Sequence, residues 1–97
     1  MPLKSYRQIM KLEYYPQHYL EEIADSFVAS FRCSFKAGCR RSTIRLVYHR
    51  KNFKDKEIIR NVVYPLMVQT MNDECAIEFD QKFRHDFIVV KLKAILK

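Results

Sequence analysis

The stretch that decides the fold is residues 58–71, IIRNVVYPLMVQTM, which carries an apolar stripe at helical spacing. Its apolar side chains recur three and four residues apart, so they share one face of a helix. We predict this helix from about residue 55 to residue 71. Pro65 lies inside it, where a proline removes an intrahelical hydrogen bond and costs about 3 kcal/mol. The proline therefore predicts a kink near residues 61–64.

Two stretches that alternate apolar and polar side chains follow this helix. Residues 75–80 (CAIEFD) and 87–95 (FIVVKLKAI) have the two-residue period of strands, and a polar turn at residues 81–86 joins them. In the second stretch, the alternation places Lys91 and Lys93 on the side opposite to Leu92. A short helix over residues 91–97 is the alternative for its end.

A strand and a further helix precede the deciding stretch. Residues 43–49 (TIRLVYH) predict a strand from their β-branched and aromatic content, and residues 50–54 form a basic loop. Apolar spacing predicts a helix over residues 16–35, with Gly38 as its stop signal. The strand–helix–strand unit implies parallel pairing, and the last two strands imply an antiparallel hairpin. We therefore expect an α/β fold, with a small mixed sheet, helices packed on it and a leading N-terminal helix.

Length and composition exclude several classes of protein. The 97 residues suit one domain, residues 16–97, after an arm of residues 1–15 without periodicity. The single glycine excludes Walker-type and GxGxxG nucleotide sites, which need several glycines. Three cysteines without a CxxC pair predict neither a disulfide framework nor a zinc site, and we expect Cys33 and Cys75 to be small buried hydrophobes. No apolar run reaches about eighteen residues, so no membrane span is expected.

Side chains suited to catalysis or metal binding are scattered along the chain. Glu78 and Asp80 share one side of a predicted strand, but nearby Lys82 and Arg84 favour a surface ion pair over a catalytic carboxylate pair. The histidines stand without metal-ligand spacing, at His18, His49 and His85. We therefore expect no catalytic, cofactor-binding or metal-binding residue and no small-molecule substrate, and the chain is not expected to be an enzyme.

The charge favours a polyanionic partner. Lys plus Arg number 18 and Asp plus Glu number 11, a formal net charge of +7. Half of the basic residues lie between Arg32 and Lys56, where Asp55 is the one acid and aromatic residues are interleaved. A solvated basic face is the ordinary explanation of such a run, and the aromatic residues favour RNA binding instead. The predicted phosphate contacts are Arg32, Lys36, Arg40, Arg41, Arg50, Lys51, Lys54 and Lys56.

From residue 43 onward the order of segments resembles a known family. A strand TIRLVY, a basic loop, a helix with an interior proline (RNVVYPLMVQTMN), a strand CAIEF, a turn with FRHD and a strand FIVVKL follow one another. This order is similar to the thioredoxin-like domain shared by certain mitochondrial ribosomal proteins of both subunits and a small accessory subunit of respiratory complex I. Pro65, Asn72 and the strand at residues 75–79 carry the resemblance, which covers about fifty residues. The family's glycine-rich turn is replaced here by residues 50–54.

The resemblance implies a thioredoxin-like fold and a structural role in the mitochondrial ribosome, within the matrix. Its expected partners are rRNA and neighbouring ribosomal proteins, and the helix and basic segment before the first strand favour the large subunit over the small one. Redox enzymes of the fold carry CxxC after the first strand, whereas residues 49–56 contain no cysteine.

Two other functions remain open at this stage. The first is a non-catalytic accessory subunit of a mitochondrial membrane complex such as complex I, in which the basic run meets acidic protein or lipid. The second is a degenerate relative of the LAGLIDADG homing nucleases, because residues 19–25 (YLEEIAD) resemble their signature helix. That motif's glycines are absent, and Asp25 alone stands near a catalytic position.

Overall fold

The computed structural model describes residues 17–97, and at residues 52–55 it describes the backbone alone. The predicted N-terminal arm and Pro16 lie outside the described residues. The first described element is helix α2, Gln17–Lys36, as its apolar spacing predicts. One face of α2 is buried, through Leu20, Ala24, Phe27, Val28 and Phe31.

Gly38 ends α2, as the sequence predicts. The Cys39 N–H donates to the Ser34 carbonyl at 3.0 Å, and the Gly38 N–H donates to the Phe35 carbonyl at 3.1 Å. These two bonds form a Schellman motif, whose C′ residue adopts the left-handed conformation that suits glycine. Gly38 has a φ of +102°. The motif turns the chain directly into the first strand.

The second helical segment is continuous but changes its winding in the middle. After a 3-10 turn η2, Arg50–Asn52, it consists of α3, Phe53–Ile58, a π-helical turn η3, Ile59–Val63, and α4, Tyr64–Thr70. The predicted helix is confirmed, and its irregularity takes the form of a π turn. The Tyr64 N–H donates to the Ile59 carbonyl, five residues back. This wider turn accommodates Pro65, because a proline in a regular helix clashes with the carbonyl four residues back, here that of Asn61.

Three strands form a wholly antiparallel sheet: β1, Arg41–His49, β2, Cys75–Arg84, and β3, Phe87–Leu96. Their order is β1-β3-β2, so β3 pairs with both neighbours. The predicted parallel pairing of the first two strands, and with it the mixed sheet, is therefore wrong. The helical segment connects β1 at one edge of the sheet to β2 at the other edge. The hairpin then places β3 between them.

The β2–β3 hairpin is longer than its sequence suggests. Residues 81–84 continue β2 rather than forming a polar turn, and the connection consists of His85 and Asp86 alone. His85 has a φ of +43°. β3 runs to Leu96, so the alternative of a late helix is wrong. Beyond residue 80, three of the four residues of β2 are polar and Phe83 is exposed, because this strand lies at the edge of the sheet and pairs with β3 on one side only.

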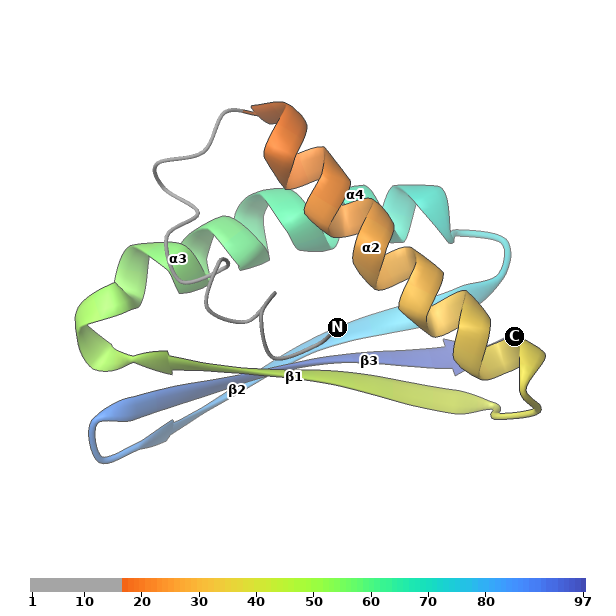
Figure 1. The fold of residues 1–97 in the computed structure, drawn as a ribbon. Helices are drawn as coiled ribbons and strands as arrows, with labels where there is room; N and C mark the ends of the chain where they lie inside the picture. Colours follow the sequence, from red (N-terminus) through yellow and green to blue (C-terminus); the bar gives the residue numbers. More distant parts are fainter. Residues whose placement is uncertain (1–16) are drawn as a thin grey trace.

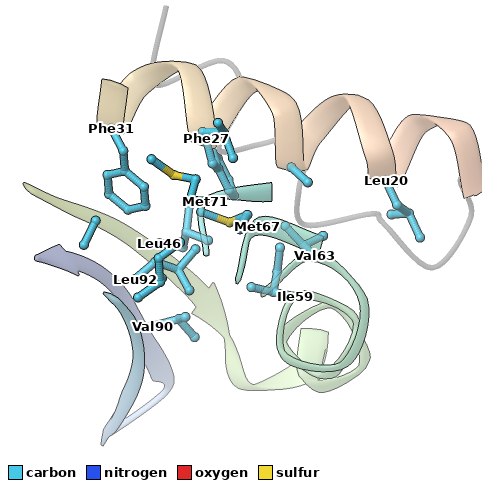
Figure 2. Packing of buried hydrophobic residues seen from close by; sticks show 14 of the residues in the cluster. Leu20, Phe27, Phe31, Leu46, Ile59, Val63, Met67, Met71, Val90 and Leu92 are labelled. Atoms are coloured by element: carbon cyan, nitrogen blue, oxygen red, sulfur yellow. The ribbon is translucent and has the colours of Figure 1, made fainter. Parts of the chain in front are cut away.

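All the helices in the described part of the chain lie on one side of the sheet (Figure 1). Between the two layers is one apolar core, in which Phe31 from α2, Met67 from α4 and Leu92 from β3 are 0% exposed (Figure 2). The structure thus has the expected α/β class, with an N-terminal helix, a second helix and one sheet. The thioredoxin-like fold is not confirmed, because the sheet of the described residues has three antiparallel strands only.

Candidate nucleic-acid interface

The side of the sheet that faces away from the helices forms a continuous surface, which we call the outward face. Residues that pair across neighbouring strands point to the same side of the sheet. Along each strand the side chains alternate between the two sides, so the residues next to the core residues point outward. Across the three strands they form five rows. From the hairpin end, the rows are His49–Phe87–Arg84, Val47–Val89–Lys82, Arg45–Lys91–Asp80, Thr43–Lys93–Glu78 and Arg41–Ile95–Ala76.

The outward face is predominantly basic. It carries two acids, Glu78 and Asp80, and a formal net charge of +4. Its basic side chains are Arg41, Arg45, Lys82, Arg84, Lys91 and Lys93. Asp80 lies 3.9 Å from Lys93 in an ion pair that is about 40% exposed on both sides. The sequence predicts Lys82 and Arg84 as the partners of Asp80. In the structure its partner is instead Lys93, on the neighbouring strand.

The eight predicted phosphate contacts do not form one patch. Arg32, Lys36, Arg40 and Arg41 lie around the start of β1, whereas Arg50, Lys51, Lys54 and Lys56 follow its end. A strand rises about 3.4 Å per residue, so the nine residues of β1 hold the two groups roughly 27 Å apart. The outward face lies between the two groups and connects them. Lys36, Arg40, Arg41, Arg50 and Lys51 are exposed, and the Lys54 side chain lies outside the described residues.

Arg32 already has an anionic partner within the protein. Its Nε donates to Glu74 Oε1 at 3.0 Å and its Nη2 donates to Oε2 at 2.5 Å, a two-pronged contact that joins α2 to the segment before β2. This hydrogen bond raises the pKa of Arg32 and lowers the pKa of Glu74. The contact compensates the charge of Arg32, so this residue attracts phosphate less than an isolated arginine does.

Lys56 departs from the prediction because it is buried. Its side chain is 4% exposed, and its Nζ lies 2.9 Å from the Glu57 carboxylate and 5.9 Å from the centre of the Phe83 ring. Its ammonium group therefore serves the packing of α3 against the hairpin rather than offering a charge to solvent. We exclude Lys56 from the interface.

Five basic residues of the outward face are absent from the predicted set. Arg45 lies within the basic run of the sequence, and the other four come from the hairpin, at Lys82, Arg84, Lys91 and Lys93. The alternation of residues 87–95 already places Lys91 and Lys93 opposite the apolar face. Joining them to Arg45 requires the strand order, in which β3 pairs directly with β1.

An aromatic pair lies at the hairpin end of the outward face. The Phe87 ring is 48% exposed, and its centre lies 5.7 Å from that of His49 in an edge-to-face arrangement with an interplanar angle of 79°. The Arg50 N–H donates to the Asp86 carbonyl at 2.7 Å, which fixes the end of β1 against the hairpin turn. Basic and aromatic side chains therefore adjoin one another on a fixed backbone.

The cysteines differ in their surroundings. Cys75 is buried, as expected, and burial raises the pKa of its thiol, which disfavours the reactive thiolate. Cys33 is exposed on α2, so its expected burial is wrong, and Cys39 is exposed as well. Cys33 lies at the margin of the apolar stripe of α2, where sequence spacing does not separate core from surface.

Among the side chains that the structure describes, in residues 17–51 and 56–97, no three or more His, Cys, Asp or Glu are arranged to hold a metal ion. No helix in the described part of the chain has the length and apolar character needed to cross a membrane. Comparisons with protein-family models, with curated proteins and with solved structures find no match.

Proposed function

We propose that the chain is a structural RNA-binding protein, which binds phosphates through the outward face and the exposed basic residues at both ends of β1. The observation that carries the proposal is the net charge of +4 on the outward face, on a side of the sheet that no helix of residues 17–97 covers (Figure 1). Clustered cations attract a polyanion and release its counterions on binding. The proposed role is structural: these side chains bind phosphates and take part in no reaction.

The mitochondrial ribosome, with the large subunit favoured, is the assembly that we propose for this role. The support for it is the sequence resemblance of residues 43–93 and the basic character of the face, and a thioredoxin-like ancestry belongs to the same proposal. In this setting, rRNA covers the outward face and neighbouring ribosomal proteins contact the rest of the surface.

The test measures how RNA affinity depends on salt. The variant carries Arg45→Gln, Lys82→Gln, Arg84→Gln and Lys91→Gln on the outward face. Each lost contact with a single strand lowers the slope of log affinity against log salt by about 0.7, so the slope falls by about 3 in total. Arg60→Gln is the control, since Arg60 lies in η3 on the helical side, 6.0 Å from the Phe79 ring centre. A slope that stays the same in the quadruple variant contradicts the proposal.

A second experiment separates RNA from the alternative partners. The tagged full chain is purified with its native assembly and sedimented before and after ribonuclease treatment. A ribonucleoprotein component loses its fast-sedimenting position when the RNA is digested. Particles that contain no RNA and sediment unchanged favour the accessory subunit of a membrane complex instead.

A further inference from the structure

The hairpin end of the outward face combines two features that a purely electrostatic surface does not need. Phe87 is 48% exposed although it belongs to the central strand, whose next residue, Ile88, is 1% exposed in the core. In the next row Val47 lies beside Val89, which is 6% exposed and adds little accessible surface of its own. A single exposed phenylalanine is ordinary on a protein surface. Here, however, the ring contacts the His49 ring of the neighbouring strand, so the aromatic surface extends across two strands.

Cations surround this aromatic surface. Arg84 is the register partner of Phe87 on β2, and Lys82 is the partner of Val89. Arg45 and Lys91 form the third row, across β1 and β3. Asp80 completes that row on β2, but its carboxylate pairs with Lys93 of the next row rather than with Lys91. The rings are therefore flanked by positive charge on both edges of the sheet.

From this arrangement we infer that the outward face binds single-stranded RNA, with an unpaired base stacked on Phe87 and the phosphates held by Arg45, Lys82, Arg84 and Lys91. The inference deepens the proposed function and rests on it. Exposed aromatic rings in a cationic groove are the usual means of binding a single strand, because every base offers a flat face. In an RNA duplex the bases are stacked within the helix and cannot reach a ring on a sheet.

The groove along α2 and α4 is less suited to a nucleic acid. Its lining carries Asp25 as well as Arg32 and Lys36, and Arg32 is paired with Glu74. Neither an exposed ring nor an excess of available cations distinguishes this groove. The outward face thus fits an unpaired polyanion better.

The chain contains no tryptophan, which permits a direct test of stacking. Phe87→Trp introduces one indole on the outward face. Phe83→Trp introduces one at a site of similar exposure, 56%, on the same hairpin but on the helical side of the sheet. A base stacked on indole quenches its fluorescence. We expect an unlabelled uridylate decamer to quench the fluorescence of Phe87→Trp in a saturable manner. The fluorescence of Phe83→Trp should stay nearly unchanged.

Affinities of alanine variants provide the second measurement. A stacked base contributes about 1–3 kcal/mol, so Phe87→Ala should weaken binding of a labelled uridylate decamer by at least about fivefold. Phe83→Ala, the matched control, should change it less than about twofold. Neither variant should alter the affinity for a ten-base-pair RNA duplex of mixed sequence. Circular dichroism of each variant verifies that the fold is retained.

The outcomes distinguish RNA binding by the chain from the stacking of a base on Phe87. If the wild-type chain binds neither probe, RNA binding itself fails and the single-strand inference fails with it. If the chain binds both probes with normal salt dependence, and Phe87→Ala behaves like Phe83→Ala, the proposed function stands and the stacking inference is overturned. Equal quenching of both tryptophan variants leads to the same conclusion.

Discussion

On the inward face of the sheet, Leu46, Val90 and Leu92 are at most 3% exposed, and they pack against the helices. One residue along the same strands, Arg45 and Lys91 point away from the helices. The inward side chains belong to a core cluster that both helical segments and all three strands share, whereas most outward side chains, such as Arg45, are exposed or half-buried. Substitutions on the two faces should therefore have separable consequences: the inward face determines stability, and the outward face determines binding.

The largest effect should follow from comparing adjacent residues of β3. Leu92→Ala removes a fully buried side chain from the core, which typically lowers the free energy of unfolding by 2–5 kcal/mol. Lys91→Ala changes an outward side chain and should alter the free energy of unfolding by about 0.5 kcal/mol or less. Urea denaturation followed by circular dichroism measures both.

The same pair of variants should exchange their roles in RNA binding. Where Leu92→Ala still folds, it should keep the wild-type salt slope, whereas Lys91→Ala should reduce the slope by about 0.7. A large loss of stability in Lys91→Ala would show that the outward face also stabilises the fold. The assignment of stability to the inward face and of binding to the outward face would then be wrong.

Sequence periodicity was sufficient to predict the inward face. The helical spacing of residues 20–31 and 58–71 and the alternation around Leu92 identify nearly all the core residues, because burial forces apolar side chains into the period of each element. Gly38 likewise predicted the end of α2 through its conformational freedom. Residues 81–84 are predicted to form a turn but continue β2, since an edge strand whose side chains are largely exposed needs no apolar alternation.

The outward face was much less accessible to sequence reasoning. A run of cations in sequence suggested one patch, but a nine-residue strand separates its two halves, and burial removes Lys56. Arg45 and Lys91 become neighbours only through the pairing of β1 with β3, which is a long-range contact between residues 46 apart in sequence. Strand order depends on how the whole chain packs, and no local period encodes it.

A smaller effect should come from the polar link between the helical layer and the edge of the sheet. The Tyr64 hydroxyl donates to the Ile77 carbonyl at 2.8 Å, which satisfies a backbone group on the open edge of β2. Tyr64→Phe removes this hydrogen bond and preserves the ring contact with Phe79, at 5.7 Å between centres. We expect a loss of about 0.5–1.5 kcal/mol in the free energy of unfolding.

Thermal or urea denaturation measures the Tyr64 effect, and the RNA affinity should stay unchanged because the residue lies on the inward side. Thr70→Ala is a suitable comparison, since the Thr70 hydroxyl donates to the Leu66 carbonyl within α4 and joins no separate elements. Tyr64→Phe should destabilise the protein more than Thr70→Ala does. The reverse order would indicate that the edge carbonyl is satisfied equally well by water.

The smallest expected effect is the pH dependence of the Arg32–Glu74 contact. Because Arg32 lowers the pKa of Glu74 in the folded protein, the carboxylate stabilises the fold above the pKa of the unfolded chain, about 4.3. This stabilisation is lost as the pH falls through the lowered folded pKa. Glu74→Gln should therefore be less stable than wild type near pH 6, and the difference should shrink as the pH falls below about 4.

Urea denaturation at a series of pH values measures the difference between Glu74→Gln and wild type. Glu78→Gln on the outward face makes the same change of charge without touching Arg32, so it serves as the matched control. Both partners of the Arg32–Glu74 contact are well exposed, at 49% and 38% of their side-chain surface, so salt should weaken it. A difference that persists unchanged at low pH or at about 1 M salt, where the Debye length is about 3 Å, would mean that the two-pronged contact acts by packing α2 against the β2 entry rather than by charge.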